Sequence, residues 1–234
     1  MRMEQRGIEP APPAALRPSE YTAALIQVLH ERADRVRGAA VLDMGCGSGV
    51  VLAAAAALGA RSVTGIDIEA DAVASSAELL RAIDADVQVC CLRSDLWRDV
   101  PPGRYDIVVA NLPQFPLAAT DLPGRLPTWS AGGRDGRLLL DPFLEGLAGQ
   151  LAPDGAAFLT HNAFVDIPAS RELAARYGLT LASVARTLVV LPPEKLARMT
   201  PELLAAESGR TIHRYGSYAF GEMHVVSVGR GTVR

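Results

Sequence analysis

Three glycines at alternate positions follow an apolar run near the start of the sequence, and one carboxylate stands just before them. The order is Asp43, Gly45, Gly47 and Gly49. Because glycine has no side chain, the backbone here can come into contact with a ligand at the carboxyl edge of a sheet. A dinucleotide site requires a further glycine three residues after Gly47, where this chain has Val50. The spacing therefore disfavours a nicotinamide-dependent oxidoreductase, which stays open as an alternative.

Two further acidic residues come at the ends of the next two predicted strands. Asp67 can accept hydrogen bonds from both hydroxyls of a ribose, and Ile68 offers an apolar surface to an adenine ring. Ser94, Asp95 and Leu96 follow the third predicted strand and place another acceptor where the exocyclic amine of adenine would lie. The carboxyl ends of these three strands therefore predict a ligand that contains a nucleoside.

Short apolar runs alternate with longer segments of helical pattern. The predicted strands cover residues 39–44, 62–68, 87–92, 106–110 and 156–160, and the predicted helices residues 50–58, 70–83, 138–151 and 169–177. Strands without polar alternation are covered on both faces, and their alternation with helices indicates a doubly wound, mostly parallel α/β sheet. Two more strands, at residues 179–191 and 224–228, are expected to form a terminal antiparallel hairpin and to bring the sheet to seven strands.

The series from Asp43 to Gly49, with Asp67 and Asp95 at the ends of successive strands, resembles the class I S-adenosylmethionine-dependent methyltransferases. The resemblance implies a Rossmann-like methyltransferase fold, S-adenosylmethionine as cofactor and S-adenosylhomocysteine as product. It also implies that the three glycines lie behind the methionine moiety, that Asp67 holds the ribose, and that Asp95 and Leu96 flank the adenine. The predicted cofactor-binding residues are Glu20, Thr22, Asp43, Gly45, Gly47, Gly49, Asp67, Ile68, Ser94, Asp95, Leu96 and Asn111.

A narrower resemblance begins where the fourth predicted strand ends. Residues 111–114, Asn-Leu-Pro-Gln, are similar to the Asn-Pro-Pro-Tyr signature of methyltransferases that modify planar nitrogens, notably the HemK-like glutamine methyltransferases of release factors. Residues 17–22 look like the Pro-x-Glu-Asp-Thr segment of that group, and residues 129–137 look like its Gly-Gly-x-x-Gly-Arg segment. The resemblance covers residues 18–151 and implies that Glu20 and Thr22 close over the methionine end.

An asparagine at that strand end has a chemical reason. A carboxamide nitrogen is a poor nucleophile because its lone pair is delocalised into the carbonyl. If the Asn111 side-chain oxygen and the Leu112 carbonyl each accept one N–H, the nitrogen faces the sulfonium methyl, and orientation does most of the work. Asn111, Leu112 and Pro113 are therefore the predicted catalytic residues, with Pro113 shaping the strand exit, and no dedicated general base is required.

The chain departs from this signature at two positions. Leu112 stands where the group has its first proline, and Gln114 replaces the aromatic residue that would lie against a planar substrate. The Gln114 amide could instead hydrogen-bond a polar acceptor, and Phe115 could supply the missing aromatic face. The predicted substrate-binding residues are Gln114, Phe115, Trp129, His161 and Tyr218. For the last three the alternatives are a packing anchor, a solvated loop end and a surface hairpin.

The segments before the glycine loop and between the last two predicted strands bear on the domain organisation and on the acceptor. We expect one methyltransferase domain over residues 1–234, in which residues 1–38 form a helical segment over the cofactor site and residues 192–217 an insertion between the last two strands. Bacterial release-factor enzymes carry a docking domain before the glycine loop, whereas only about forty residues precede it here. An O- or N-methyltransferase of a small metabolite in bacterial specialised metabolism is therefore an alternative. A non-catalytic S-adenosylmethionine-binding protein is another.

The composition limits the classes of partner. The 234 residues are 49% hydrophobic, enough for one core. The net charge of −3 provides no overall basic field, so we expect a small-molecule, peptide or protein acceptor and no extended nucleic-acid surface. The longest apolar stretch, residues 50–60, is about half of what a bilayer span requires, and residues 1–13 contain no export signal. We therefore expect no membrane association.

The cysteine, histidine and lysine content bears on the location of the protein, on metal binding and on its genome. The adjacent Cys90 and Cys91 are unsuited to a mutual disulfide, which favours a reducing, cytoplasmic location. The four histidines and three cysteines show no metal-ligand spacing, so no metal is expected. Among 23 basic residues only Lys195 is a lysine, and the wealth of arginine and alanine indicates a GC-rich bacterial genome. Nothing in the sequence indicates an oligomeric state.

Overall fold

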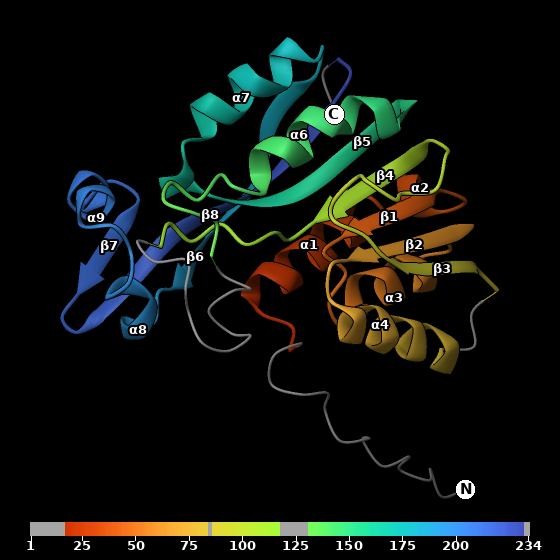
Figure 1. Cartoon of the computed structure of the whole chain (residues 1–234), viewed down its shortest axis with the longest axis horizontal. Coiled ribbons are helices and arrows are strands. Elements are labelled where there is room, and N and C mark those ends of the chain that lie inside the picture. Colours follow the sequence, from red (N-terminus) through yellow and green to blue (C-terminus); the bar gives the residue numbers. More distant parts are fainter. Residues whose placement is uncertain (1–16, 84–85, 118–130, 232–234) are drawn as a thin grey trace, which may run out of the picture.

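One eight-stranded sheet runs through the molecule, with strand order β3-β2-β1-β4-β5-β8-β6 and β7 paired to β8 (Figure 1). This computed structural model describes residues 17–83, 86–117 and 131–231. The strands are β1 (Ala40–Met44), β2 (Ser62–Asp67), β3 (Gln88–Arg93), β4 (Tyr105–Ala110), β5 (Leu151–Asn162), β6 (Thr180–Val190), β7 (Ile212–Tyr215) and β8 (Tyr218–Gly229). β1 to β5 pair in parallel, and β8 is antiparallel to β5, β6 and β7. The predicted α/β class and mostly parallel sheet are confirmed.

Helices cover both faces of the sheet. They are α1 (Glu20–Glu31), α2 (Ala33–Val36), α3 (Val50–Ala57), α4 (Ala70–Ala82), α6 (Leu140–Gln150), α7 (Ile167–Arg176), α8 (Pro193–Leu196) and α9 (Pro201–Glu207). One buried cluster joins α6 and α7 to one face, and a second joins α1, α3 and α4 to the other. Every residue of β1 is buried for this reason, and its sequence therefore shows no polar alternation.

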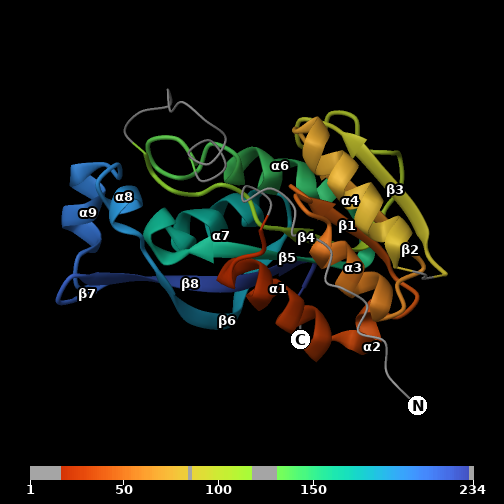
Figure 2. The ribbon, with the colours of Figure 1, turned by 90° about the horizontal axis from the view of Figure 1, so that it is seen from below.

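The C-terminal part of the sheet has one strand more than expected. β7 has only four residues, and β8 begins at Tyr218, six residues before the predicted start. Within residues 218–223, exposed or partly buried positions alternate with buried ones, whereas residues 225–229 are all buried. The reason is that the β7–β8 hairpin, with α8 and α9, projects at one end of the sheet (Figures 1 and 2). A strand covered on one face lacks the apolar run used to predict the others.

The two segments set apart in the sequence lie beside this sheet. α1 packs its Leu25, Val28 and Leu29 side chains into the same cluster as β5, β6 and β8. Residues 192–217 contain α8, α9 and β7 between β6 and β8. The division of the chain into domains stays a prediction. Within the described residues, no helix has the length and apolar character needed to cross a bilayer.

Candidate active site

A cavity of about 550 Å³ opens at the carboxyl ends of β1, β2 and β4. The register aligns these ends, because Met44 of β1 lies between Ile66 of β2 and Ala110 of β4. The glycine loop, Asp67 and Asn111 therefore follow neighbouring strands at one edge of the sheet. The described lining includes Arg17, Ser19, Thr22, Asp43, Gly45, Gly47, Asp67, Ile68, Glu69, Ser94, Asp95, Leu96, Asn111, Leu112, Pro113, Leu139 and Lys195.

The three glycines of the loop have different surroundings. All three have positive φ, and a Cβ at Gly47 would meet nothing closer than the Gly45 carbonyl at 4.0 Å. The space in front of Gly47 is thus open to a ligand. A Cβ at Gly49 would lie 2.8 Å from the Ser76 Cα on α4, and Gly49 is outside the cavity lining. The close packing of α3 on α4 requires a glycine at this position, and its predicted place behind the methionine moiety stays a prediction.

Two aspartates, Asp43 and Asp67, line the cavity. Asp67 accepts the Gly47 N–H at Oδ2 and the Glu69 N–H at Oδ1, both at 3.0 Å, so each oxygen keeps a lone pair for a hydroxyl. Burial raises the pKa of Asp67, and its backbone donors oppose that shift. Asp43 is 2% exposed, and burial together with the Asp67 charge raises its pKa to about 8. The Asp43 carboxyl is therefore mainly protonated at neutral pH.

The far end of the cavity combines apolar and polar surfaces after β2 and β3. Ile68 is 55% exposed there, which leaves an apolar surface that a planar ring could cover. Ser94 Oγ donates to the Leu96 carbonyl at 3.1 Å and accepts the Asp99 N–H at 2.9 Å. Leu96 takes a left-handed conformation with φ of 49°. The Ser94 side chain thus holds a tight turn that presents Asp95 and Leu96 to the cavity.

The Asn111 side chain is held by a residue that sequence analysis missed. Thr160 Oγ1 donates to Asn111 Oδ1 at 2.8 Å. The register pairs Ala110 of β4 with Leu159 of β5, so the next residue on each strand, Asn111 and Thr160, come together. Strand alignment alone could have suggested this pair. Leu112 is 7% exposed and lies against Gly45, with 3.4 Å between Leu112 Cδ2 and the position of a Gly45 Cβ.

Gln114 has a structural role, and its predicted contact with the substrate is wrong. The side chain is 2% exposed, its Nε2 donates to the Thr160 carbonyl at 2.6 Å, and its Oε1 accepts the Asn162 N–H at 3.0 Å. Both ends of the amide are therefore used to attach the chain after β4 to β5. Phe115 is also buried, against Phe164 on one side and the Lys195 ammonium on another, and it lies outside the cavity lining. Phe115 is therefore a core residue.

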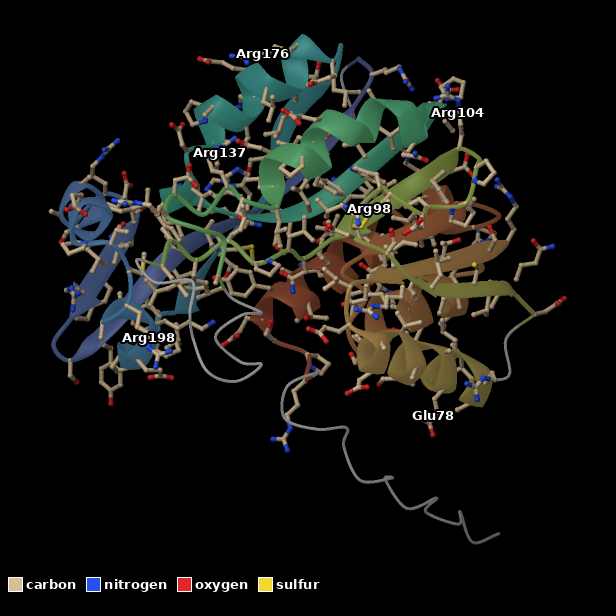
Figure 3. The ribbon with its side chains drawn as sticks, viewed as in Figure 1. Glu78, Arg98, Arg104, Arg137, Arg176 and Arg198 are labelled. Carbon is tan, nitrogen blue, oxygen red and sulfur yellow. The ribbon has the colours of Figure 1, made fainter. Side chains whose placement is uncertain are left out.

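His161 is buried within β5, whereas the sequence favoured a solvated loop end. Its ring nitrogens lie 2.8 Å from Ser170 Oγ and 2.9 Å from the Asn162 carbonyl oxygen. Burial lowers the pKa of His161 to about 4, so the ring is neutral at pH 7. Arg137, labelled near α7 in Figure 3, donates to the same Ser170 hydroxyl at 3.1 Å. The predicted substrate contact of His161 is replaced by this network between β5 and α7.

The other predicted residues fall at three different places. Tyr218 is 69% exposed at the start of β8 and outside the cavity lining, so it contributes to the surface hairpin, and its contact with the substrate stays a prediction. Trp129 lies outside the described residues. Thr22 lines the cavity and accepts the Ser19 N–H at 3.2 Å, whereas Glu20 is exposed and outside the lining. That Glu20 closes over the methionine end stays a prediction.

The contacts of the cavity match the parts of S-adenosylmethionine. The open space before Gly47, the free lone pairs of Asp67 and the exposed face of Ile68 suit a methionine chain, a ribose diol and an adenine, in that order. The volume of about 550 Å³ is within the range of small-molecule sites. The residues present fit the cofactor.

Comparison with known proteins places this geometry among methyltransferases. A family model described as ribosomal protein L11 methyltransferase (PrmA) matches residues 20–119. A ribosomal protein L11 methyltransferase of Geotalea uraniireducens is 51% identical over 72 residues, which are 31% of this chain and 22% of that protein. The solved 16S rRNA N2 G1207 methyltransferase (RsmC) of Thermus thermophilus, in complex with AdoMet and guanosine, has a TM-score of 0.56 at 21% identity, over 93% of this chain and 45% of that one.

These names correct the predicted partners. The expectation of a small-molecule, peptide or protein acceptor and of no extended nucleic-acid surface is contradicted by relatives named for a ribosomal protein and by a neighbour named for ribosomal RNA. A net charge of −3 was a poor guide, because a partner meets the local charge of one surface and not the sum over the chain.

One relative matches over most of its own length. A candidate protein N5-glutamine methyltransferase of Methanocaldococcus jannaschii is 30% identical over 144 residues, which are 61% of this chain and 70% of that protein. This match confirms the predicted enzyme class and the HemK-like resemblance, and it removes the oxidoreductase and non-catalytic alternatives. The chain belongs to the class I S-adenosylmethionine-dependent methyltransferases, in the family that includes the ribosomal protein L11 methyltransferases (PrmA) and the protein N5-glutamine methyltransferases.

Proposed function

We propose that this enzyme methylates a planar nitrogen of a protein side chain, such as a carboxamide or a guanidinium, and that Asn111 orients the acceptor. The observation that carries the proposal is the Asn111 amide at the cavity wall, with its Oδ1 fixed by the Thr160 hydroxyl at 2.8 Å. A protein acceptor is supported by the relatives named for ribosomal protein L11 and for protein glutamine.

The donor site in this proposal uses residues at successive strand ends. Asp67 binds the ribose hydroxyls, Gly45 and Gly47 leave room for the methionine chain, and Ile68 with Leu96 flanks the adenine. When bound, the cofactor supplies a methyl group on a positively charged sulfur. The departing sulfur is neutral and needs no acid, and the methylated nitrogen gives up one N–H proton to solvent as the product leaves. The chain therefore need only hold the two reactants in line.

The acceptor geometry follows from the lone pairs of one oxygen. A carboxamide oxygen has two, and the Thr160 hydroxyl uses one of them at Asn111. The second is left for an N–H of the acceptor, and the Leu112 carbonyl takes the other N–H. The apolar Leu112 and Pro113 side chains exclude water from the reacting nitrogen.

The experiment compares Asn111→Ala with Gln27→Ala, which removes an exposed carboxamide on α1 outside the cavity lining. Purified enzyme is incubated with methyl-labelled S-adenosylmethionine and with bacterial ribosomal protein L11, release factors and total ribosomal protein. We expect label in a protein, located by peptide mass spectrometry on a side-chain nitrogen. Asn111→Ala lowers turnover by about 100-fold or more, and its affinity for S-adenosylhomocysteine stays within about threefold of the parent.

Two results would refute the proposal. One is a turnover of Asn111→Ala equal to that of the Gln27→Ala control, which would make Asn111 a passive part of the wall. The other is label that enters only oxygen or carbon atoms of the acceptor, which do not need an amide to orient an N–H.

A further inference from the structure

The only lysine of the chain, Lys195, lies at the wall of the donor cavity. It belongs to α8, which follows β6, and neither the glycine loop nor the asparagine signature involves it. Its Nζ lies 4.3 Å from the centroid of the Phe115 ring, four residues beyond Asn111. In the sheet order, β4 and β6 are on the far side of β1 from β2 and β3. Lys195 therefore lies toward the acceptor end of the cavity and away from the proposed adenine end.

The Lys195 ammonium has unused donors. Across residues 17–83, 86–117 and 131–231, it makes no ion pair or hydrogen bond, and its ammonium lies over the Phe115 ring. An ammonium has three N–H donors, and one aromatic face satisfies only part of that capacity. Burial lowers the pKa of Lys195, and the nearby Glu194 and Glu20 oppose this shift. A half-buried cation with free donors at a ligand site indicates an anionic group of the ligand.

The cavity lining contains both acidic and basic side chains. Its described lining has the carboxylates of Asp67, Glu69 and Asp95, the mainly protonated carboxyl of Asp43, and two cations, Arg17 and Lys195. The donor brings a single carboxylate, on its methionine end, and Arg17 of the same lining is available for it. This leaves Lys195 for a second carboxylate, which the other reactant must bring.

We propose that Lys195 binds a carboxylate of the methyl acceptor, so that the enzyme selects a planar nitrogen within an acidic peptide segment. The inference rests on the proposed function, because it assigns the substrate class of the same site. Lys195 acts here as a specificity-determining residue and takes no part in the transfer of the methyl group.

The experiment uses synthetic peptides with one central glutamine, asparagine or arginine, flanked by glutamate, alanine or lysine. We expect the parent enzyme to prefer glutamate-flanked peptides over alanine-flanked ones by about tenfold in kcat/KM. Lys195→Gln removes this preference, Lys195→Arg keeps it, and Lys195→Glu shifts it to lysine-flanked peptides. The control is Arg198→Gln, which removes an exposed charge three residues further along (Figure 3) and leaves the preference unchanged.

A second measurement tests the other source of a carboxylate. S-adenosylhomocysteine carries the methionine carboxylate, and 5′-methylthioadenosine lacks it. If Lys195→Gln weakens only the former, Lys195 binds the donor and the proposal is overturned. Peptides methylated equally whatever their flanking charge also overturn it and leave the proposed function intact. Failure to methylate any peptide, combined with failure to label any protein, would overturn both.

Discussion

Gly49 and Gly47 are two residues apart, and substitution by alanine is expected to damage different properties of the enzyme. Gly49 has φ of +78°, and an added Cβ would lie 2.8 Å from the Ser76 Cα and 2.9 Å from its Oγ. The Cα belongs to the α4 backbone and cannot rotate away, so α3 and α4 must move apart. A left-handed alanine costs about 1–2 kcal/mol, and overpacking of this kind adds about 1–3 kcal/mol. Gly49→Ala should therefore lose about 2–5 kcal/mol of unfolding free energy.

Gly47→Ala is the matched control, because it has the same backbone penalty without the collision. Its φ is +51°, and its Cβ would meet nothing within 4 Å except the Gly45 carbonyl at that limit. We expect a loss of about 1–2 kcal/mol of unfolding free energy. Because the added Cβ enters the cavity, we also expect it to weaken S-adenosylhomocysteine binding by about tenfold or more.

Urea unfolding and calorimetric titration with S-adenosylhomocysteine distinguish the two variants. For a chain of this length, the expected loss in Gly49→Ala corresponds to a Tm lower by roughly 5–15 °C. The reasoning is refuted if Gly49→Ala unfolds at the same urea concentration as Gly47→Ala. It is equally refuted if Gly49→Ala loses more affinity for the product than Gly47→Ala does.

Substitutions at three further residues test the pKa of Asp43 and the hydrogen bonds of Gln114 and Thr160. Burial raises the pKa of Asp43 to about 8, so the folded state keeps a proton that the unfolded chain releases above about pH 4. The Asp43 contribution to the unfolding free energy should therefore fall as pH rises from about 4 to 8, whereas the buried neutral His161, with its pKa lowered to about 4, contributes in the opposite direction below about pH 6.5. Relative to the parent, Asp43→Asn should gain stability as pH rises over that range, and a difference in urea midpoint that does not change with pH would contradict this cause. Gln114→Leu leaves the Thr160 carbonyl and the Asn162 N–H without their partner, which should lower the free energy of unfolding, measured in urea, by about 2–5 kcal/mol. A loss below about 0.5 kcal/mol would argue against the structural role of these two hydrogen bonds. Thr160→Val should lower kcat for methylation by about tenfold with product affinity unchanged, and Thr160→Ser should restore it; equal kcat in both variants would contradict the positioning role.

The sequence was sufficient where a function depends on a few residues at the end of one strand. Glycines with positive φ, Asp67 at the end of β2 and Asn111 after β4 are local features, and the alternation of strands and helices brings such ends to one edge of a parallel sheet. The predicted fold class and the predicted enzyme class depended on these features, and both are confirmed.

The same reasoning failed where two side chains of similar chemistry differ in direction. Asn111 and Gln114 are both carboxamides three residues apart, yet Asn111 lines the cavity and Gln114 is buried against β5. The difference depends on the partner strand, because the atoms that Gln114 bonds lie 46 and 48 residues away in the chain. Likewise, His161 was expected at a loop end because nothing in its neighbourhood predicts that β5 continues to Asn162 beside β8.

The sequence by itself therefore determined the alternation of strands and helices up to β5, the strand ends where the donor site is proposed, and the asparagine at the exit of β4. Only the tertiary structure decided which polar side chains reach the cavity. It brought Thr160 to Asn111 and Lys195 to Phe115, and it attached α1 to β5 through a 2.7 Å hydrogen bond from the Tyr21 hydroxyl to Asn162, 141 residues away. Such contacts arise from the packing of distant segments, and a local pattern of residues contains no record of them.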